Sequence, residues 1–258
     1  MNNNINFQRN YQLQESYEFI KDNAIKKLAK YFDYPDLFMF NDVEKRIIFS
    51  TEQLIPTVPR HRPRVMLLFS NPHPLSVHRG MFLSPNSIGR ENLFWPVMEA
   101  AGWLPIPIED RTQPQKLADI CLNLKYAGPF ELIFYCYYAF PTDYPEDIKR
   151  IFGKDFFQQT IEPESKEEFR DTIQEKSVDA VVTFNKSIFN LVSSDPIGTY
   201  IKRLIKGEIL QGQVEGIEQQ VPIFLTFPTG FIYHKDFMQL RMDNLAAIRK
   251  ILRNRVNC

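Results

Sequence analysis

The sequence predicts an α/β fold: a three-layer αβα sandwich around a central, mainly parallel four-stranded sheet, with an N-terminal helical extension. Short apolar runs alternate with stretches of helical spacing, most of the runs end at turn-forming residues, and the runs are apolar enough to be buried on both faces. This pattern is typical of parallel strands covered by helices. The predicted strands are residues 65–69, 130–138, 178–184 and 222–227.

The segment before the first strand is expected to be helical. Apolar residues recur at helical spacing over residues 16–31, which predicts an amphipathic helix on the flank of the sheet. The polar residues 1–10 are expected to fray, and residues 57–64, with two prolines and four basic groups, form an expected extended connector. We therefore predict an N-terminal helical extension and connector over residues 1–60.

Further helices are expected between and after the strands. Residues 94–101 have helical character and end at Gly102, and a helix is expected to begin near residue 185, directly after the third strand. The last helix is predicted over residues 236–255, where apolar side chains again recur at helical spacing.

The overall charge of the chain neither supports nor excludes a nucleic-acid partner. Acidic and basic residues number 31 each among the 258 residues, so a nucleic-acid surface would have to be a local basic patch. Three clusters are rich in basic residues, and they would count as such a patch only if they share a face with the binding pocket. They lie in residues 60–64, 202–206 and 249–255.

Cysteine usage and the chain termini favour a reducing, cytoplasmic setting. Cys121, Cys136 and Cys258 are an odd number of cysteines without metal-ligand spacing. The first ten residues lack the apolar core of a signal peptide, and no run approaches the length of a membrane span. Gly-rich phosphate loops, nucleophile elbows and HExxH motifs are absent from the sequence, so we expect no cofactor and no metal. We also expect a monomer.

The polar loop after the first predicted strand is the best candidate for a ligand pocket. The strand stops abruptly at Ser70, Asn71 and Pro72, and in open α/β sheets ligands bind beyond the carboxyl ends of the strands. The amide of Asn71 offers a donor and an acceptor together, while Pro72 restricts the Asn71 backbone to an extended conformation.

Two loops of the sequence resemble those of the uracil-DNA glycosylase superfamily. LLFSNPHP, followed by GMFLSPN and NLFW, resembles the first motif of the mismatch-type, Asn-Pro-Gly group, and FLTFPTGFIYHKDF resembles the second motif. The strand VDAVVTF with NKSIFNLV is similar to the strand that precedes the second motif. The resemblance implies that residues 61–258 form a glycosylase-like α/β domain, with specific matching in the two loops only.

The resemblance implies hydrolysis of the N-glycosidic bond of uracil or a related damaged base that is flipped out of DNA. Asn71 would orient the attacking water, Phe82 would stack on the base, and Phe231 or Ile232 would fill the gap left in the duplex. Thr229, His234 and Lys235 would hold backbone phosphates. The implied site has catalytic residues Asn71 and Thr229, base-binding residues Ser70, Pro72, His73, Phe82 and Phe227, and DNA-binding residues Gly230, Phe231, Ile232, His234 and Lys235.

Some residues depart from the family pattern. Asn71 stands where the most active members carry an Asp, so slow, mismatch-type chemistry is the most to expect. Phe227 replaces a His or Asn that would donate a hydrogen bond to the base, and His73 replaces a glycine and could supply the missing donor. NPHPLSVHRGMF by itself also looks like the second motif, displaced toward the N-terminus.

Each site residue also has a structural interpretation. Asn71 could brace a turn, as Asn before Pro commonly does, and Phe82 could simply belong to the core. Three functions stay open: a divergent DNA glycosylase, a catalytically inactive protein of the same fold that binds nucleic acid or a modified base, and another α/β protein that mimics the motifs. The third function would be favoured if Asn71 and Thr229 lay at opposite ends of the sheet.

Overall fold

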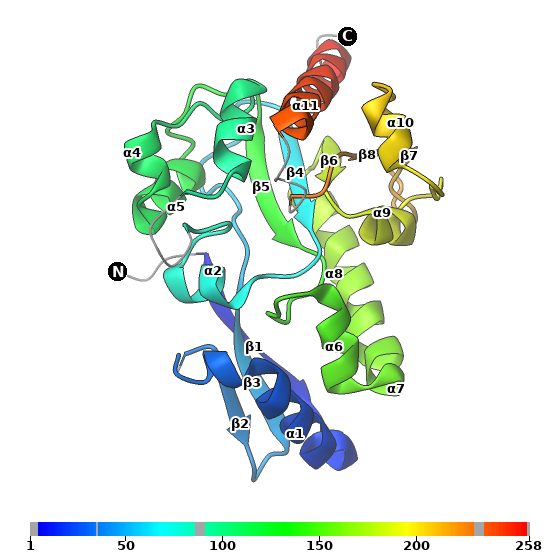
Figure 1. The fold of residues 1–258 in the computed structure, drawn as a ribbon. Coiled ribbons are helices and arrows are strands. Elements are labelled where there is room, and N and C mark those ends of the chain that lie inside the picture. The colour runs from blue at the N-terminus through cyan, green and yellow to red at the C-terminus, as the bar shows by residue number, and fades with distance from the viewer. Residues whose placement is uncertain (1–4, 35, 86–90, 230–234, 257–258) are drawn as a thin grey trace.

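A computed structural model of the chain describes residues 5–34, 36–85, 91–229 and 235–256, without the side chains of residues 235, 236 and 256. The fold is mixed α/β and contains two sheets (Figure 1). The larger sheet has five strands in the order β5-β4-β6-β8-β7, and the smaller, N-terminal sheet has three in the order β1-β3-β2.

The larger sheet is mainly parallel. Strand β4 lies between β5 and β6 and pairs in parallel with both, and β6 pairs in parallel with β8. The four runs predicted from the sequence form these four strands. Their bounds are Arg64–Phe69 for β4, Glu131–Cys136 for β5, Ala180–Thr183 for β6 and Pro222–Leu225 for β8.

The prediction of four strands missed one edge strand. β7 (Leu210–Gln213) pairs antiparallel with β8. Its sequence, LQGQ, buries only Leu210 and Gly212, and an edge strand needs one covered face only. A segment with two glutamines and a glycine carries almost no strand signal, because such residues are depleted from strands or neutral in them.

Both faces of the larger sheet are buried. Met66 and Leu68 of β4 belong to one hydrophobic cluster, whereas Val65, Leu67 and Phe69 belong to the other. Since successive side chains of a strand point to opposite faces, the two clusters are the two sides of the sheet. On the first side lie α6, α8 and α9, and the same cluster extends to α1 beside the N-terminal sheet; on the second side lie α3, α5 and α11 (Figure 1).

The helices predicted from the sequence are present with small differences at their ends. The helix predicted over residues 16–31 is α1 (Tyr17–Leu28) with a 3-10 turn on each side, and the last predicted helix is α11 (Lys235–Val256). The other helices are α2 (Pro74–Arg79), α3 (Phe94–Ala100), α4 (Ile108–Arg111), α5 (Pro114–Leu122), α6 (Pro145–Phe152), α7 (Lys154–Phe156), the π-helix Phe157–Ile161, α8 (Glu162–Glu175), α9 (Lys186–Val192) and α10 (Ile201–Ile205).

The N-terminal region is not simply helical, which corrects the prediction. It forms three antiparallel strands beside α1: β1 (Asn6–Gln12), β2 (Phe38–Asn41) and β3 (Arg46–Glu52). Residues 6–10, which were expected to fray, are held by pairing of β1 with β3. Polar side chains do not prevent this pairing, because the ladder is made by the backbone and β1 lies at the edge of the sheet.

The N-terminal sheet lies next to the carboxyl ends of β4 and β5, in the lower half of Figure 1. Aromatic contacts join it to the rest of the chain: the rings of Phe49 and Phe140 lie 4.9 Å apart, and those of Tyr11 and Phe152 lie 5.5 Å apart. The last residue of β3, Glu52, is thereby carried to the place where the parallel strands end.

Candidate functional site

The loops after β4 and β5 are hydrogen-bonded to each other beyond the ends of the strands. The backbone N–H groups of Tyr137 and Tyr138 donate to the carbonyl oxygens of Phe69 and Ser70 at 2.9 and 2.8 Å. Thr142 N–H then donates to the carbonyl of Pro72 at 3.1 Å. Strand pairing thus continues into the loops and fixes the position of the residues between them.

Asn71 lies at the centre of these bonds. Its Nδ2 donates to the carbonyl oxygen of Thr142 at 2.8 Å, to Thr142 Oγ1 at 3.0 Å and to the carbonyl of Pro72 at 3.1 Å. Its Oδ1 accepts a hydrogen bond from Ser70 Oγ at 3.0 Å. The amide nitrogen therefore braces the two loops, whereas the carbonyl oxygen keeps one lone pair for a further donor.

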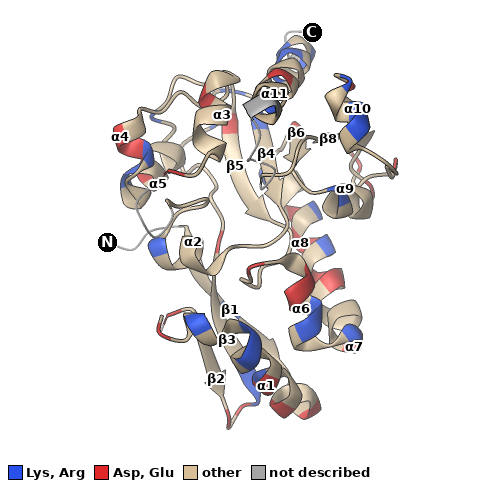
Figure 2. Ribbon diagram, viewed as in Figure 1, with Lys and Arg blue, Asp and Glu red and all other residues tan. Residues whose placement is uncertain are grey.

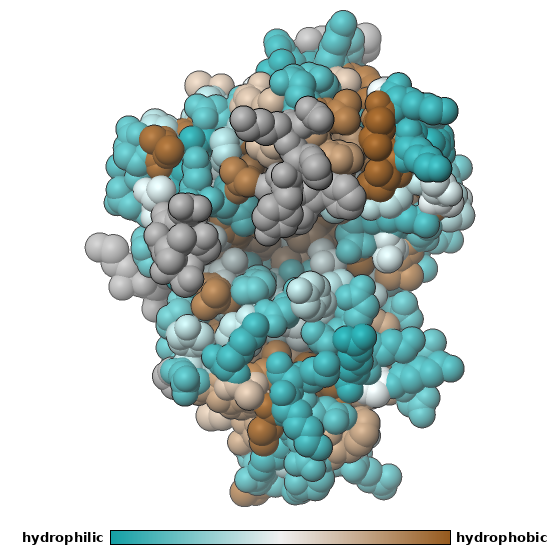
Figure 3. All heavy atoms as spheres, in the orientation of Figure 1, coloured by the Kyte–Doolittle hydropathy of each residue, from teal (hydrophilic) through white to brown (hydrophobic). Residues whose placement is uncertain are grey.

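A cavity of about 450 Å³ opens at the carboxyl ends of the parallel strands, and we call it the strand-end cavity. The strands β4 and β5 point toward the middle of the molecule (Figure 1), where the space-filling surface is hollowed (Figure 3). The lining residues are Glu52, Phe69, Ser70, Asn71, His73, Leu75, Ser76, Phe82, Leu83, Ser84, Pro85, Asn92, Cys136, Thr142, Asp143, Pro145, Phe184, Asn185, Pro228 and Thr229.

The structure brings the two predicted motif loops together. Asn71 from the loop after β4 and Thr229 from the loop after β8 line the same cavity, so both loops lie at one end of the sheet. Ser70, His73 and Phe82 line it as well. This is the arrangement that the glycosylase resemblance requires.

One wall of the strand-end cavity is aromatic. The rings of Phe69 and Phe184 are stacked with centroids 5.3 Å apart, and Phe82 lies 5.8 Å from Phe69. Phe82 is buried in the second hydrophobic cluster and also lines the cavity, so the core and stacking interpretations of this residue are compatible. A flat, apolar wall opposite polar side chains suits a planar heterocycle.

Contacts at both ring nitrogens hold the His73 side chain in one orientation. Nδ1 accepts a hydrogen bond from the N–H of Leu75 at 3.2 Å, which caps α2, and Nε2 lies 3.2 Å from Oδ1 of Asp143. Burial, the largest effect, lowers the pKa of His73 below its ordinary value although Asp143 opposes this change. His73 is therefore neutral at pH 7, with Nε2 carrying the proton.

Asp143 supplies a negative charge to the strand-end cavity. Burial acts to raise its pKa, but hydrogen bonds from Lys30 Nζ, at 2.7 Å, and from the Tyr31 hydroxyl outweigh this and leave the pKa lowered. The carboxylate is thus ionised at neutral pH. Both partners belong to the N-terminal region, which therefore contributes to the site.

Two predicted base-binding residues do not line the cavity. Pro72 is buried, and its carbonyl oxygen is used by the loop bonds. Phe227 is 1% exposed and belongs to the first hydrophobic cluster, with its ring 6.4 Å from that of Phe237. Gly230, Phe231, Ile232 and His234 lie outside the described residues, and of Lys235 only its place at the start of α11 is described.

Glu52 is a site residue that the sequence did not reveal. Its side chain lines the strand-end cavity although it comes from the N-terminal sheet, and it is 3% exposed. Its Oε2 is buried, and no hydrogen-bond partner for it exists within the described part of the chain. Burial raises the pKa of Glu52 well above its ordinary value, so the carboxyl is held in its neutral form. The residues around Glu52, FSTEQ at positions 49–53, form no local pattern that distinguishes a buried glutamate from one at the surface.

Asn185 is a second missed residue, and a signal for it existed. It lies two residues after the end of β6, where strand-end polar residues of a parallel sheet converge. Its Oδ1 accepts from the N–H of Ile188 at 3.1 Å and caps α9, and the residue lines the cavity. The side chain is thereby fixed at the cavity wall beside the aromatic Phe184.

The basic clusters do not face the strand-end cavity. Arg60, Arg62 and Arg64 lie at the amino end of β4 and bond to Asp179, Glu131 and backbone carbonyls. The other two clusters lie on α10 and on the far end of α11, at the top of Figure 2, away from the carboxyl ends of β4 and β5. A nucleic-acid surface at the cavity would have to use other residues.

Residue chemistry gives no sign of a metal centre in the described segments. No group of three or more His, Cys, Asp or Glu side chains among them is arranged to hold a metal ion. Cys121 and Cys136 are free and buried. Among the described helices, none combines the length and the apolar composition needed to cross a bilayer.

Comparison with known proteins adds no relative. No model of a known protein family matches the chain, and no curated protein matches it.

Proposed function

We propose that the strand-end cavity binds a single nucleobase extruded from DNA and that the protein is a divergent DNA glycosylase with the three-layer αβα arrangement of that superfamily. The substrate would be uracil or a related damaged base, with its N-glycosidic bond cleaved by an Asn71-positioned water. The observation that carries this proposal is the meeting of Asn71, Thr229 and the Phe82 wall in one cavity.

The size and lining of the cavity support the binding of a base. About 450 Å³ falls within the ~300–1,000 Å³ of ordinary small-molecule sites. Phe69, Phe82 and Phe184 offer a surface on which a base stacks. The amide of Asn185 and the hydroxyl of Thr229 offer polar groups for the edge of the base or for the sugar.

The chemistry rests on positioning and electrostatics. The free lone pair of Asn71 Oδ1 accepts a hydrogen bond from water and aims it at the anomeric carbon of the sugar. The water forms the new C–O bond as the N-glycosidic bond breaks, and the bonding electron pair leaves with the base. The attacking water loses a proton to solvent, and the departing base takes one up. The ionised carboxylate of Asp143 lines the same cavity and favours the cation-like sugar of the transition state.

DNA contacts near the cavity would come from residues other than the three basic clusters. Lys186 begins α9 immediately after the cavity residue Asn185 and is half-buried. The predicted phosphate contacts of Thr229, His234 and Lys235 remain part of the proposal, as do the DNA-binding role of Gly230 and the gap-filling role of Phe231 or Ile232. Such contacts supply affinity without reading sequence.

A second function is favoured by two specific observations. Asn71 Nδ2 is fully used in bracing the loops, and Phe227, which replaces a hydrogen-bond donor of the family, is buried away from the cavity. Both fit a catalytically inactive protein of glycosylase fold that binds nucleic acid or a modified base.

Release of the base separates the two functions. Oligonucleotides with uracil opposite guanine, uracil opposite adenine, or uracil in a single strand are incubated with the protein and then treated with alkali, which cleaves at abasic sites. Strand scission by the wild-type protein that is lost in Asn71→Ala supports the glycosylase. Salt-dependent DNA binding without scission of any of the three supports the binding protein. If the protein neither cleaves nor binds any of these oligonucleotides, both proposed functions are contradicted.

A further inference from the structure

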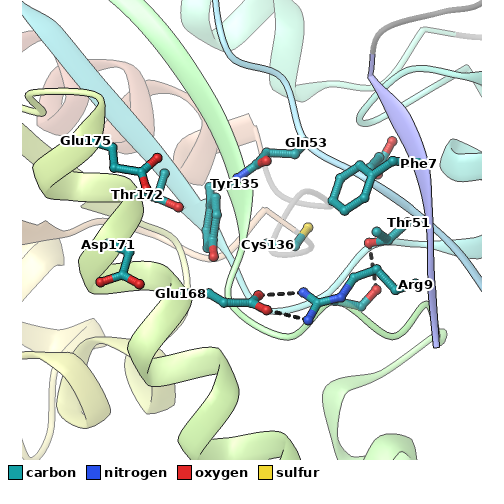
Figure 4. Close-up of a pocket in the computed structure, with 12 residues that line it drawn as sticks. Phe7, Arg9, Thr51, Gln53, Tyr135, Cys136, Glu168, Asp171, Thr172 and Glu175 are labelled. Carbon is teal, nitrogen blue, oxygen red and sulfur yellow. Dashed lines mark hydrogen bonds and ion pairs between the residues drawn. The ribbon is translucent and has the colours of Figure 1, made fainter. Parts of the chain in front are cut away.

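A second cavity, which shares Glu52 with the strand-end cavity, lies between the N-terminal sheet, β5 and α8 (Figure 4). It also has a volume of about 450 Å³. Its walls carry four acidic side chains and one basic side chain, and we call it the acidic cavity. The lining residues are Phe7, Arg9, Thr51, Glu52, Gln53, Tyr135, Cys136, Ala139, Glu168, Asp171, Thr172 and Glu175.

The single basic residue of the acidic cavity is already neutralised. Both terminal nitrogens of Arg9 donate to the two carboxylate oxygens of Glu168, across the space between β1 and α8 (Figure 4). A bidentate pair of this kind holds the guanidinium in a fixed plane. It leaves the remaining acids without that counter-charge.

The other acids of α8 are weakly paired. Asp171 has no ion-pair partner within the described residues, and Glu175 has only its neighbour Lys176, at 3.5 Å. Both side chains are exposed and line the cavity from the same helix. The field inside the cavity is therefore negative and favours a cation.

Glu52 provides an independent indication of a ligand. It is 97% covered, since 3% of its surface is exposed, and Oε2 has no hydrogen-bond partner within the described residues. Leaving a buried polar atom unpaired costs about 1–3 kcal/mol, and folded proteins rarely tolerate this without a functional reason. A ligand with N–H donors removes this cost when it occupies the cavity.

The chemistry of the walls identifies the class of cation. Carboxyl groups of Glu52 and Asp171 accept hydrogen bonds, while the rings of Tyr135 and Phe7 present apolar surface to methylene groups and attract ammonium charge. The described acidic, His and Cys side chains form no cluster suited to a metal ion. We propose that the acidic cavity is a binding site for a small organic cation that carries primary ammonium groups on an alkyl chain, of the diamine class.

Ligand binding should release a proton. An ammonium group beside Glu52 favours its ionised form, so the raised pKa of this carboxyl falls on binding. The charged and titratable groups around Glu52 come from each neighbouring element. They are Arg9 of β1, Tyr135 and Cys136 of β5, Glu168, Asp171 and Glu175 of α8, and His73 and Asp143 in the strand-end cavity.

Calorimetric titration with putrescine tests the proposal without any reference to base release. The wild-type protein is expected to bind one putrescine saturably, with proton release seen as a different binding enthalpy in two buffers of unlike ionisation enthalpy. The uncharged analogue 1,4-butanediol should give no saturable heat. Glu52→Gln and Asp171→Asn should each raise the dissociation constant about tenfold, because each removes a charge-assisted hydrogen bond.

Glu167→Gln is the matched control, since Glu167 lies on the same helix but is exposed outside the cavity. It should bind putrescine as the wild type does. The proposal is overturned if putrescine gives no saturable binding, if butanediol binds equally well, or if Asp171→Asn leaves the affinity unchanged. The exposed position of Asp171 keeps this test valid even if Glu52→Gln fails to fold.

Discussion

The two cavities differ in where their walls come from along the chain. The strand-end cavity is built mainly from loops that directly follow parallel strands, whereas the acidic cavity joins β1 and β3 to α8, with Arg9 and Glu168 separated by 159 positions. The first kind of site follows from the topology of a parallel sheet. The second depends on how the N-terminal sheet docks, for which the sequence holds no local signal.

Glu52 and Cys136 line both cavities, and we call this shared pair the dividing wall. Burial is the main cause that raises the pKa of each. The dividing wall is therefore uncharged when the acidic cavity is empty of cations. Under the two proposals the cavities have different electrostatic roles: the strand-end cavity would stack a neutral ring, and the acidic cavity would compensate a positive charge.

The largest expected effect is on the chemistry of the strand-end cavity. In Asn71→Ala the rate of base release should fall about 100-fold or more, because the group that positions the water is lost. Stability should also fall by about 1–2 kcal/mol, since the loop bonds are lost. The rate is measured by single-turnover strand scission and the stability by urea unfolding.

Asn190→Ala provides the matched control for Asn71→Ala. Asn190 also braces a loop with two hydrogen bonds, one to the carbonyl and one from the N–H of Ile197, but it lines neither cavity. It should lose similar stability and keep the full rate. Equal loss of rate in both variants would mean that Asn71 acts only through the fold.

The second effect concerns the dividing wall. Because the pKa of Glu52 is raised in the folded state, its contribution to stability is fully present below its ordinary pKa and is lost as the pH rises toward the raised value. Glu52→Gln removes this dependence. The variant should therefore gain stability over the wild type as pH increases, by on the order of 1 kcal/mol near neutrality.

The prediction is checked by urea unfolding of the wild-type protein, Glu52→Gln and Glu167→Gln, which measures the free energy of unfolding from below the ordinary pKa of a glutamate carboxyl to near neutral pH. Glu167→Gln changes the same functional group at an exposed position and should follow the wild-type curve. A constant difference between Glu52→Gln and wild type at every pH would show that the pKa of Glu52 is not raised in the folded protein.

The third effect concerns the charge in the strand-end cavity. Asp143→Asn removes the acceptor shared by Lys30, Tyr31 and His73, and should reduce stability by about 1 kcal/mol near pH 7. The pKa of Asp143 is lowered, so its contribution is present above the ordinary value and is lost as the pH falls through the lowered one. The two proteins should converge in acid.

Asp42→Asn is the comparison for Asp143→Asn. Asp42 likewise accepts from a lysine, Lys21, and a tyrosine, Tyr17, but at the surface. Asp42→Asn should therefore reduce the stability by less than Asp143→Asn does. Added salt should make the effect of Asp42→Asn smaller still, because exposed ion pairs are screened. A larger loss at Asp42 than at Asp143 would contradict the account of the cavity charge.

The smallest effect is on DNA affinity. Lys186→Gln should weaken binding of uracil-containing DNA about threefold and reduce the dependence of log K on log salt by about one, as for one lost phosphate contact. Arg60→Gln should change neither quantity, since Arg60 lies at the opposite end of the sheet and bonds to Asp179 and Ser177. Fluorescence anisotropy at several salt concentrations measures both variants, and a larger effect of Arg60→Gln would place the DNA elsewhere.

The contrast between the two cavities also explains which parts of the fold and of the candidate site the sequence could predict. The four parallel strands and α11 follow from apolar runs and helical spacing, and Asn71 follows from its place after a strand. Phe82 and Thr229 are predicted only from the resemblance of their loops to the glycosylase motifs. β1 and β7 are polar edge strands whose pairing is made by the backbone, so composition hides them. Glu52 is invisible for another reason: burial of its carboxyl is a property of tertiary packing, and its sequence neighbours are ordinary.

Phe227 shows the limit of reasoning by motif position. The resemblance to the second glycosylase motif places Phe227 among the residues that bind the nucleobase. Its ring instead lies in the first hydrophobic cluster and faces Phe237 of α11. An apolar side chain at the end of a buried strand gains more by joining the core than by facing a polar cavity. Asn185, one strand away, has the polar side chain that reaches the cavity instead.

Base flipping into the strand-end cavity is tested most directly by the fluorescence of 2-aminopurine placed beside uracil in a DNA duplex. The fluorescence should rise on saturation with wild-type protein, because the neighbouring base leaves the stack. Ser84→Trp, which fills the strand-end cavity, should abolish the rise, whereas Thr172→Trp, which fills the acidic cavity, should preserve it. A rise that persists in Ser84→Trp, or its absence when wild-type protein saturates the DNA, would contradict the account.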